Sequence, residues 1–173
     1  MGIRFKTNEQ KSIEALIWVI QRGGGSINLY NAMKILFEAD KYHLNKYTRP
    51  VTGDRYIAME YGTVPNWIYG ATKLAGNSLG FSRNVNMLEN TPGRVPDRYL
   101  FSESDEEALE HGFNEYASLD FNQVRDKNHE ERAWIRARNR EPYSEAPDIL
   151  FEDMIDDPAL VDDLLEMGQY VVI

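Results

Sequence analysis

The stretch Leu29–Pro65, LYNAMKILFEADKYHLNKYTRPVTGDRYIAMEYGTVP, decides how the chain is organised. At the helical period of 3.6 residues, its first half carries one apolar stripe, and the ionisable residues Asp40 and His43 lie within that stripe. An unpaired carboxylate beneath a packed face is costly, so Asp40 must be hydrogen-bonded by neighbours or line a partly open groove. The stretch predicts a helix, a turn at Thr52–Asp54, a short strand at Tyr56–Met59 and a loop that ends at Pro65.

Asp40 and His43 are three positions apart and therefore share one helix face. Such a pair suits a metal or an acid–base couple, and with His129 it would make a small hydrolase site. It equally suits a buried, hydrogen-bonded lock between the helix and the turn that follows. The sequence has no HExxH pattern, nucleophile elbow or phosphate loop, so we favour the lock, without catalytic residues, metal or cofactor. Asp54 is predicted to accept hydrogen bonds from nearby backbone N–H groups.

Two linked motifs follow one another in this stretch. The first runs from Phe37 to Leu44, and the second from Arg49 to Pro65. In these motifs the chain resembles the Panacea domain, the SocA-like antitoxin domain formerly classed as a domain of unknown function in phage-associated proteins. The matching positions, whose role we expect to be structural, include Asp40, His43, Arg49, Pro50, Gly53, Asp54, Gly62, Pro65, His129 and Trp134.

The resemblance extends from about Leu29 to about Ile155, with Glu38 as an extra residue and with Thr48 and Thr63 in place of a glycine and a proline. It implies an antitoxin-type binding module that neutralises a cognate protein toxin by direct contact in a bacterial or phage toxin–antitoxin system. The nearest alternative is an adaptor that delivers its toxin to a bacterial protease. Because the family pairs one domain with many unrelated toxins, the sequence does not identify the toxin.

A group of aromatic residues follows the second motif. Clustered around a groove, these side chains would form a good protein-binding surface, because aromatic residues dominate interface energetics. We therefore expect partner binding at Tyr56, Tyr61, Trp67 and Tyr69.

Composition limits the class of protein. A chain of 173 residues with a hydrophobic content of 42% fits one globular domain. It has no cysteine, which excludes thiolate catalysis, disulfides and cysteine-bound zinc. The first residues contain no apolar segment of signal-peptide length, and no apolar run approaches a membrane span. We expect a cytoplasmic protein with no membrane partner.

Charge is distributed unevenly along the chain. The formal net charge is −9, and all of the acidic excess lies in residues 143–173, which contain no lysine or arginine. We expect a Panacea-like domain over residues 1–147 and an acidic helical extension over residues 148–173 that is packed on it or tethered to it. Arg125–Arg140 is the basic segment, but acids are interspersed and no aromatic ladder accompanies it, so we expect a protein partner rather than a nucleic acid. Part of the extension is expected to stay available to a basic partner.

Together these patterns predict an α+β fold, predominantly helical, with five to seven helices around a small antiparallel sheet. The sheet would combine the strand Tyr56–Met59 with a hairpin between Phe81 and Phe101 that turns at Thr91–Arg94. Ser104 and Glu107 form a capping box for the helix that follows the hairpin. The apolar end Tyr170–Ile173 is expected to add a strand or to pack on the core.

Overall fold

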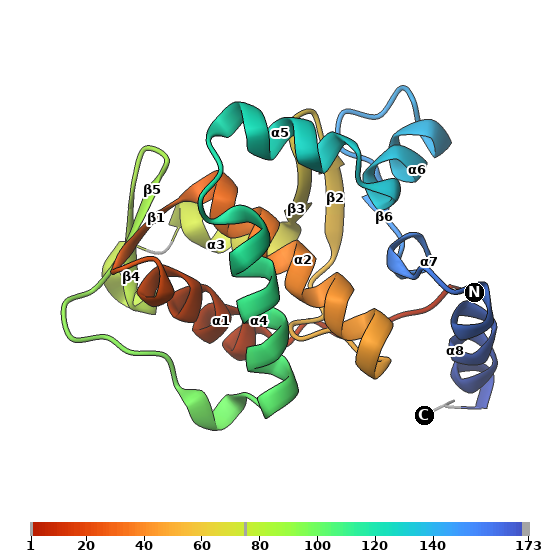
Figure 1. The fold of residues 1–173 in the computed structure, drawn as a ribbon, viewed down its shortest axis with the longest axis horizontal. Coiled ribbons are helices and arrows are strands. Elements are labelled where there is room, and N and C mark those ends of the chain that lie inside the picture. Colours follow the sequence, from red (N-terminus) through yellow and green to blue (C-terminus); the bar gives the residue numbers. More distant parts are fainter. Residues whose placement is uncertain (1, 75, 171–173) are drawn as a thin grey trace.

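The computed structural model describes residues 2–74 and 76–170. Within these ranges the chain forms eight α-helices, two short 3₁₀ helices and two three-stranded antiparallel sheets (Figure 1). The α+β, predominantly helical fold is thereby confirmed. The described helices outnumber the five to seven expected, and the strands are divided between two sheets. None of the helices in the described ranges has the length and apolar character needed to cross a membrane.

The elements follow one another in a mixed order. The helices are α1 (Glu9–Arg22), α2 (Leu29–Tyr47), α3 (Asn66–Leu74), α4 (Glu103–Tyr116), α5 (Phe121–His129), α6 (Arg132–Arg140), α7 (Phe151–Met154) and α8 (Pro158–Tyr170). The strands are β1 (Ser26–Asn28), β2 (Tyr56–Met59), β3 (Gly62–Pro65), β4 (Phe81–Asn84), β5 (Met87–Asn90) and β6 (Asp148–Ile149). The 3₁₀ helices span Gly76–Leu79 and Arg98–Leu100.

Helix α2 is the centre of the molecule, with α1 and α4 packed along it (Figure 1). It begins where the side chain of Asn28 accepts a hydrogen bond from the N–H of Tyr30 at 2.8 Å, which satisfies one free donor of the first turn. It ends at Thr48, whose backbone adopts the left-handed conformation with a φ of 69°. Most of its residues are buried, so both its apolar stripe and its polar groups face protein.

The strand arrangement differs from the expected single sheet. One sheet has the order β3-β2-β6, and the other has the order β1-β5-β4. The hairpin joins β4 to β5 through Val85 and Asn86, and not through Thr91–Arg94. Thr91–Arg94 does form a turn, but the apolar residues after it, Val95 and Tyr99, are 58% and 100% exposed. These residues therefore belong to an exposed connection and not to a strand.

The interior has two clusters of buried apolar side chains. The larger lies among α1, α2, α4 and the β1-β5-β4 sheet, and the smaller joins α2 to β2, α6 and α7. Ile149, Met154 and Ile155 belong to the smaller cluster. The boundary expected after Pro147 falls within a sheet, because the N–H of Ala58 donates to the carbonyl of Pro147 at 2.8 Å and Tyr56 pairs with Ile149. Of the apolar end Tyr170–Ile173, residues 171–173 lie outside the described ranges.

The capping box of α4 lies two residues before the expected one. Ser102 is the N-cap, and Asp105 completes the box, because their side chains and backbone N–H groups bond reciprocally at 3.1 and 2.9 Å. The expected pair Ser104 and Glu107 has other partners. Ser104 bonds His43, and Glu107 accepts from the hydroxyls of Tyr42 and Tyr47 on α2.

Candidate functional site

Asp40, a residue of the first family-like motif, is fully buried. Its Oδ1 accepts hydrogen bonds from the N–H groups of Val51 and Thr52, both at 2.8 Å. Its Oδ2 accepts from the hydroxyls of Thr52 at 2.5 Å and of Tyr56 at 2.7 Å. Burial raises the pKa of Asp40 to about 6, and the bonds from Thr52 and Tyr56 oppose that rise. The carboxylate therefore joins α2 to the segment that follows it.

His43 lies one turn further along α2 and links it to two other elements. Its Nδ1 lies 2.6 Å from the carbonyl oxygen of Arg49, and its Nε2 lies 2.9 Å from the hydroxyl of Ser104. Burial lowers the pKa of His43, which favours the neutral ring at physiological pH. A neutral ring can donate through Nδ1 and accept through Nε2, so both contacts are satisfied without charge.

Asp105 is the anionic centre beside His43. It forms ion pairs with Lys11 of α1 at 2.8 Å and with Arg49 at 2.9 Å. Burial acts to raise the pKa of Asp105, but the bonds from Lys11, the N–H of Ser102 and Arg49 outweigh it and hold the pKa below its usual range. The carboxylate of Asp105 thus connects α4 to α1 and to the segment that follows α2.

Asp54 caps helix α3 from outside the helix. Its two carboxylate oxygens accept the N–H groups of Trp67 and Ile68, each at 3.0 Å. The preceding residue, Gly53, has a φ of +72°, and a Cβ there would lie 2.7 Å from the carbonyl oxygen of Lys6. Only glycine fits this close approach without strain. Both motif residues therefore have structural contacts.

The turn between β2 and β3 is fixed by α5. Gly62 has a φ of +128°, and a Cβ there would lie 2.2 Å from Oδ1 of Asn128. The same Oδ1 accepts the N–H of Thr63 at 2.6 Å. Pro65 lies opposite Tyr56 at the end of β3 and is buried. Sequence reasoning missed Asn128, because a single polar residue in a polar helix carries no local signal of burial.

His129 and Trp134 hold the same turn from its other side. Their rings stack with centroids 4.2 Å apart. His129 Nε2 lies 2.7 Å from the carbonyl oxygen of Glu60, and Trp134 Nε1 donates to that of Met59 at 2.8 Å. His129 shares none of these partners with Asp40. These contacts therefore do not bring His129 together with Asp40 and His43, as the hydrolase hypothesis requires. No three described His, Asp or Glu residues form a group able to hold a metal ion.

The four aromatic residues expected at a partner surface have different environments. Tyr56 is 1% exposed and donates a hydrogen bond to Asp40. Its side chain therefore offers no surface to a partner, and Tyr56 is a core residue instead of the partner-binding residue that was expected. Trp67 and Tyr69 are half-buried against the larger core cluster. Tyr61 is 45% exposed. Of the four, it is therefore the most exposed side chain.

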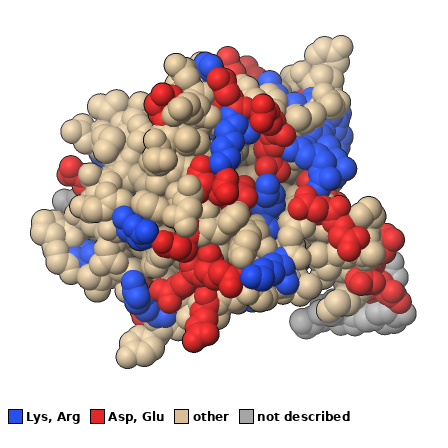
Figure 2. Space-filling model, viewed as in Figure 1, with Lys and Arg blue, Asp and Glu red and all other residues tan. Residues whose placement is uncertain are grey.

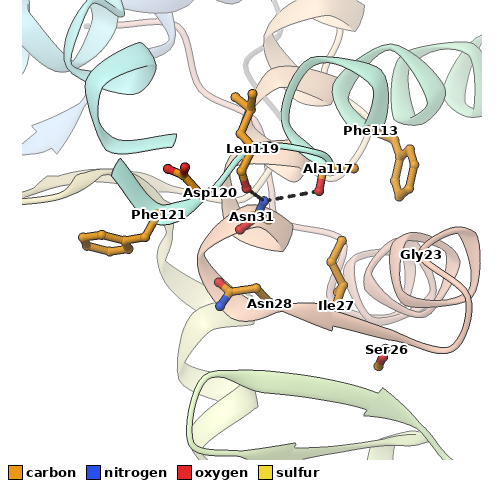
Figure 3. A pocket seen from close by; sticks show the side chains of 10 residues that line it. All are labelled: Gly23, Ser26, Ile27, Asn28, Asn31, Phe113, Ala117, Leu119, Asp120 and Phe121. Carbon is orange, nitrogen blue, oxygen red and sulfur yellow. Dashed lines mark hydrogen bonds between the residues drawn. The ribbon is translucent and has the colours of Figure 1, made fainter. Parts of the chain in front are cut away.

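A groove of about 380 Å³ lies between β1 and the connection from α4 to α5 (Figure 3). Phe113 and Phe121 lie on opposite sides of it, with Asn31 between them (Figure 3). The side-chain amide of Asn31 donates to the carbonyls of Tyr116 and Leu119, both at 2.9 Å. These bonds fix the connection that forms one wall. The groove was not expected from the sequence.

The acids of the C-terminal extension fall into two groups that differ in their ion pairs. Arg140 of α6 binds both oxygens of Asp153 at 2.6 and 2.7 Å, and Arg132 pairs with Asp156. In Figure 2, basic side chains over α6 lie next to acidic side chains over α7 and α8. Within the described ranges, no ion pair involves the acids of α8, Asp162, Asp163 and Glu166.

Two further cations of the basic segment are paired with nearby acids. Arg125 pairs with Asp126 at 3.0 Å, and Lys127 pairs with Glu115 at 2.5 Å. Such pairing reduces the positive charge that this segment could present to a phosphate backbone.

The fold and these networks define a small α+β domain whose motif residues are engaged in internal hydrogen bonds. The family model described as "Antitoxin SocA-like, Panacea domain" matches residues 33–135, and the chain belongs to this family. The resemblance seen in the sequence is thereby confirmed. No curated protein and no solved structure matches the chain.

Proposed function

We propose that this protein is an antitoxin that binds a cognate protein toxin directly in the cytoplasm and so neutralises it. Its family suggests an antitoxin role and a protein partner. The observation that carries the proposal is the internal hydrogen bonding of Asp40, a motif acid that is fully buried. Both of its oxygens are occupied by groups of the protein itself. A motif whose polar groups bond internally stabilises the fold, so we expect residues at the surface to bind the partner.

The contacts favour a binding module over the hydrolase alternative. Hydrolysis requires groups that converge on one substrate position. Asp40 and His43 are both buried, and each is bonded to groups of the protein itself. His129 stacks on Trp134 at the β2–β3 turn instead. We therefore propose no catalytic role for these three side chains.

One observation supports a proteolytic adaptor as the second candidate. Helix α8 lies at the opposite end of the molecule from β1 (Figure 1), and the residues of β1 line the groove. Its acids Asp162, Asp163 and Glu166 have no ion-pair partner within the described ranges. An adaptor needs two separate surfaces, one for the toxin and one for the protease, and this arrangement offers them.

Co-expression separates these functions. The product of the adjacent gene is expressed as the candidate toxin, with or without this protein, in a normal strain and in strains that each lack one cytoplasmic protease. Direct neutralisation predicts restored growth in every strain, with the toxin recovered intact in a complex. An adaptor predicts restored growth that fails in one protease-deficient strain. No restored growth in any strain would contradict both functions for this gene pair.

A further inference from the structure

Three aromatic side chains from separate elements meet at the surface. Phe121, at the start of α5, contacts Tyr30 of α2 and Tyr61 of the β2–β3 turn, with ring centroids 5.3 and 5.6 Å apart. Both contacts are edge-to-face. Phe121 and Tyr61 are 41% and 45% exposed. Clustered exposed aromatic residues are typical of protein interfaces.

The aromatic cluster, Tyr30, Tyr61 and Phe121, adjoins the groove beside β1. Phe121 belongs to both, because it also lines the groove. The apolar residues Ile27, Phe113 and Leu119 are among those that line the groove, and the carbonyl of Leu119 faces Asn31 (Figure 3). The amide of Asn31 fixes the α4–α5 connection, so the groove exists before any partner binds. A preformed groove that has apolar side chains among its lining and lies beside aromatic rings can bind a side chain at low entropic cost.

Charge around the groove indicates the chemistry of its occupant. Among the described residues that line it, only Asp120 is charged. One oxygen of Asp120 caps α5 by accepting the N–H of Gln123 at 2.9 Å. Arg22, which stacks on Phe113, is itself ion-paired with Glu110 at 2.8 Å. The groove therefore combines apolar and uncharged polar groups with one negative charge at Asp120, which favours a cation on the partner.

We propose that the aromatic cluster and the groove together bind a segment of the cognate toxin that presents an apolar side chain next to a lysine or arginine. The apolar side chain enters between Phe113 and Phe121, and the cation lies opposite Asp120. This inference rests on the proposed antitoxin function and gives that function a location. It retains Tyr61 from the surface expected from the sequence and places Tyr30 and Phe121 beside it.

The test uses the full-length protein and the purified product of the adjacent gene as the probe. Phe121→Ala and Tyr61→Ala remove cluster rings, and Tyr99→Ala is the matched control, because Tyr99 is 100% exposed and lies before α4. Truncating a central aromatic anchor typically costs at least about 2 kcal/mol, so we expect Phe121→Ala to raise Kd at least about thirtyfold. Tyr61→Ala should raise it about tenfold, and Tyr99→Ala should leave it within about twofold.

A charge variant tests the rim separately. Asp120→Asn keeps an oxygen that caps α5 but removes the negative charge. We expect association about threefold slower at 0.05 M salt and equal to wild type at 1 M salt, because rim charges act mainly on encounter. Melting temperatures establish that each variant is folded, and Tyr61→Ala, in an exposed turn, remains informative should Phe121→Ala fail to fold.

The outcomes separate this inference from the function on which it rests. Wild-type affinity in both Phe121→Ala and Tyr61→Ala, with restored growth, would overturn the surface and leave the antitoxin function standing. Self-association that is lost in Phe121→Ala while toxin binding is kept would assign the surface to a second copy and overturn the inference. Absence of binding and of restored growth with the wild-type protein would overturn both.

Discussion

Asp40 accepts two hydrogen bonds from Thr52, one from its backbone N–H at 2.8 Å and one from its hydroxyl at 2.5 Å. The pair fixes the turn after α2 directly against the helix, and the N–H of Val51 and the hydroxyl of Tyr56 complete the shell. Since the carboxylate is fully buried, removal of Asp40 would leave the N–H groups of Val51 and Thr52 without this acceptor, whereas the hydroxyl of Tyr56 also donates to the carbonyl of Leu36 at 3.1 Å.

Replacement of Asp40 should therefore change stability more than binding. Asp40→Ala strands several buried donors, and we expect the free energy of unfolding to fall by about 2–4 kcal/mol. Asp40→Asn keeps one acceptor oxygen and should lose about half as much. Urea denaturation followed by circular dichroism measures both. An unchanged stability combined with lost toxin neutralisation would make Asp40 a functional residue instead.

Lys34 gives a pH-dependent prediction. It is 1% exposed within α2, and burial lowers the pKa of its amine to about 7 from 10.5. Between these two values the unfolded chain binds the proton and the folded chain does not, so stability should rise as the pH increases from about 7 to about 10. Lys34→Met removes this dependence and should stabilise the fold at pH 7 by an amount on the order of 3 kcal/mol.

Chemical denaturation at about pH 7 and at about pH 10 measures the difference between Lys34→Met and the wild type. The stabilising effect should shrink as the pH approaches the pKa of a free lysine. A difference that stays constant across this range, or a variant that is less stable at pH 7, would contradict the account of Lys34.

Gly62 is predicted to tolerate no side chain. A Cβ there would lie 2.2 Å from Asn128 Oδ1, and the φ of +128° is unfavourable for other residues. We expect Gly62→Ala to lower the free energy of unfolding by at least about 2 kcal/mol. Gly70→Ala is the matched control, because nothing lies within 4 Å of its Cβ position in α3. It should be neutral or stabilise by up to about 1 kcal/mol. Similar melting temperatures for both variants would exclude this close approach.

The role of α8 can be tested by removing it alone. A chain ending at Asp157 keeps Ile149, Met154 and Ile155 in the smaller core cluster, whereas one ending at Pro147 would lose them. If the acids of α8 attract a basic toxin surface, the shortened chain should associate more slowly than the full chain at low salt. The two rates should converge at about 1 M salt, where the Debye length is about 3 Å. Equal rates at low salt would exclude α8 from toxin encounter.

Local patterns in the sequence predicted much of the frame. The helix through Asp40 and the strand from Tyr56 follow from periodicity and from the positions of turn residues. The burial of Asp40 followed from its place in an apolar stripe. In each case the deciding information lies within a few residues along the chain.

The remainder depends on contacts between distant segments. β3 was expected as a loop, because Gly62–Pro65 becomes a strand only by pairing with β2. The meeting of Phe121 with Tyr61 joins residues far apart in the chain, and nothing in either local pattern indicates it. The same holds for Asn128, whose burial is set by the close approach of Gly62. Sequence periodicity reports which face is buried but not which partner covers it.

Titration of the purified toxin with the purified protein tests the central claim of direct neutralisation. Toxin activity is measured at toxin concentrations far above Kd, with no protease present. Direct binding predicts that activity falls linearly and reaches zero at a fixed molar ratio, at once and reversibly. Activity that persists at every ratio until a protease is added, or that disappears with time at small fractions of one equivalent, would contradict the claim.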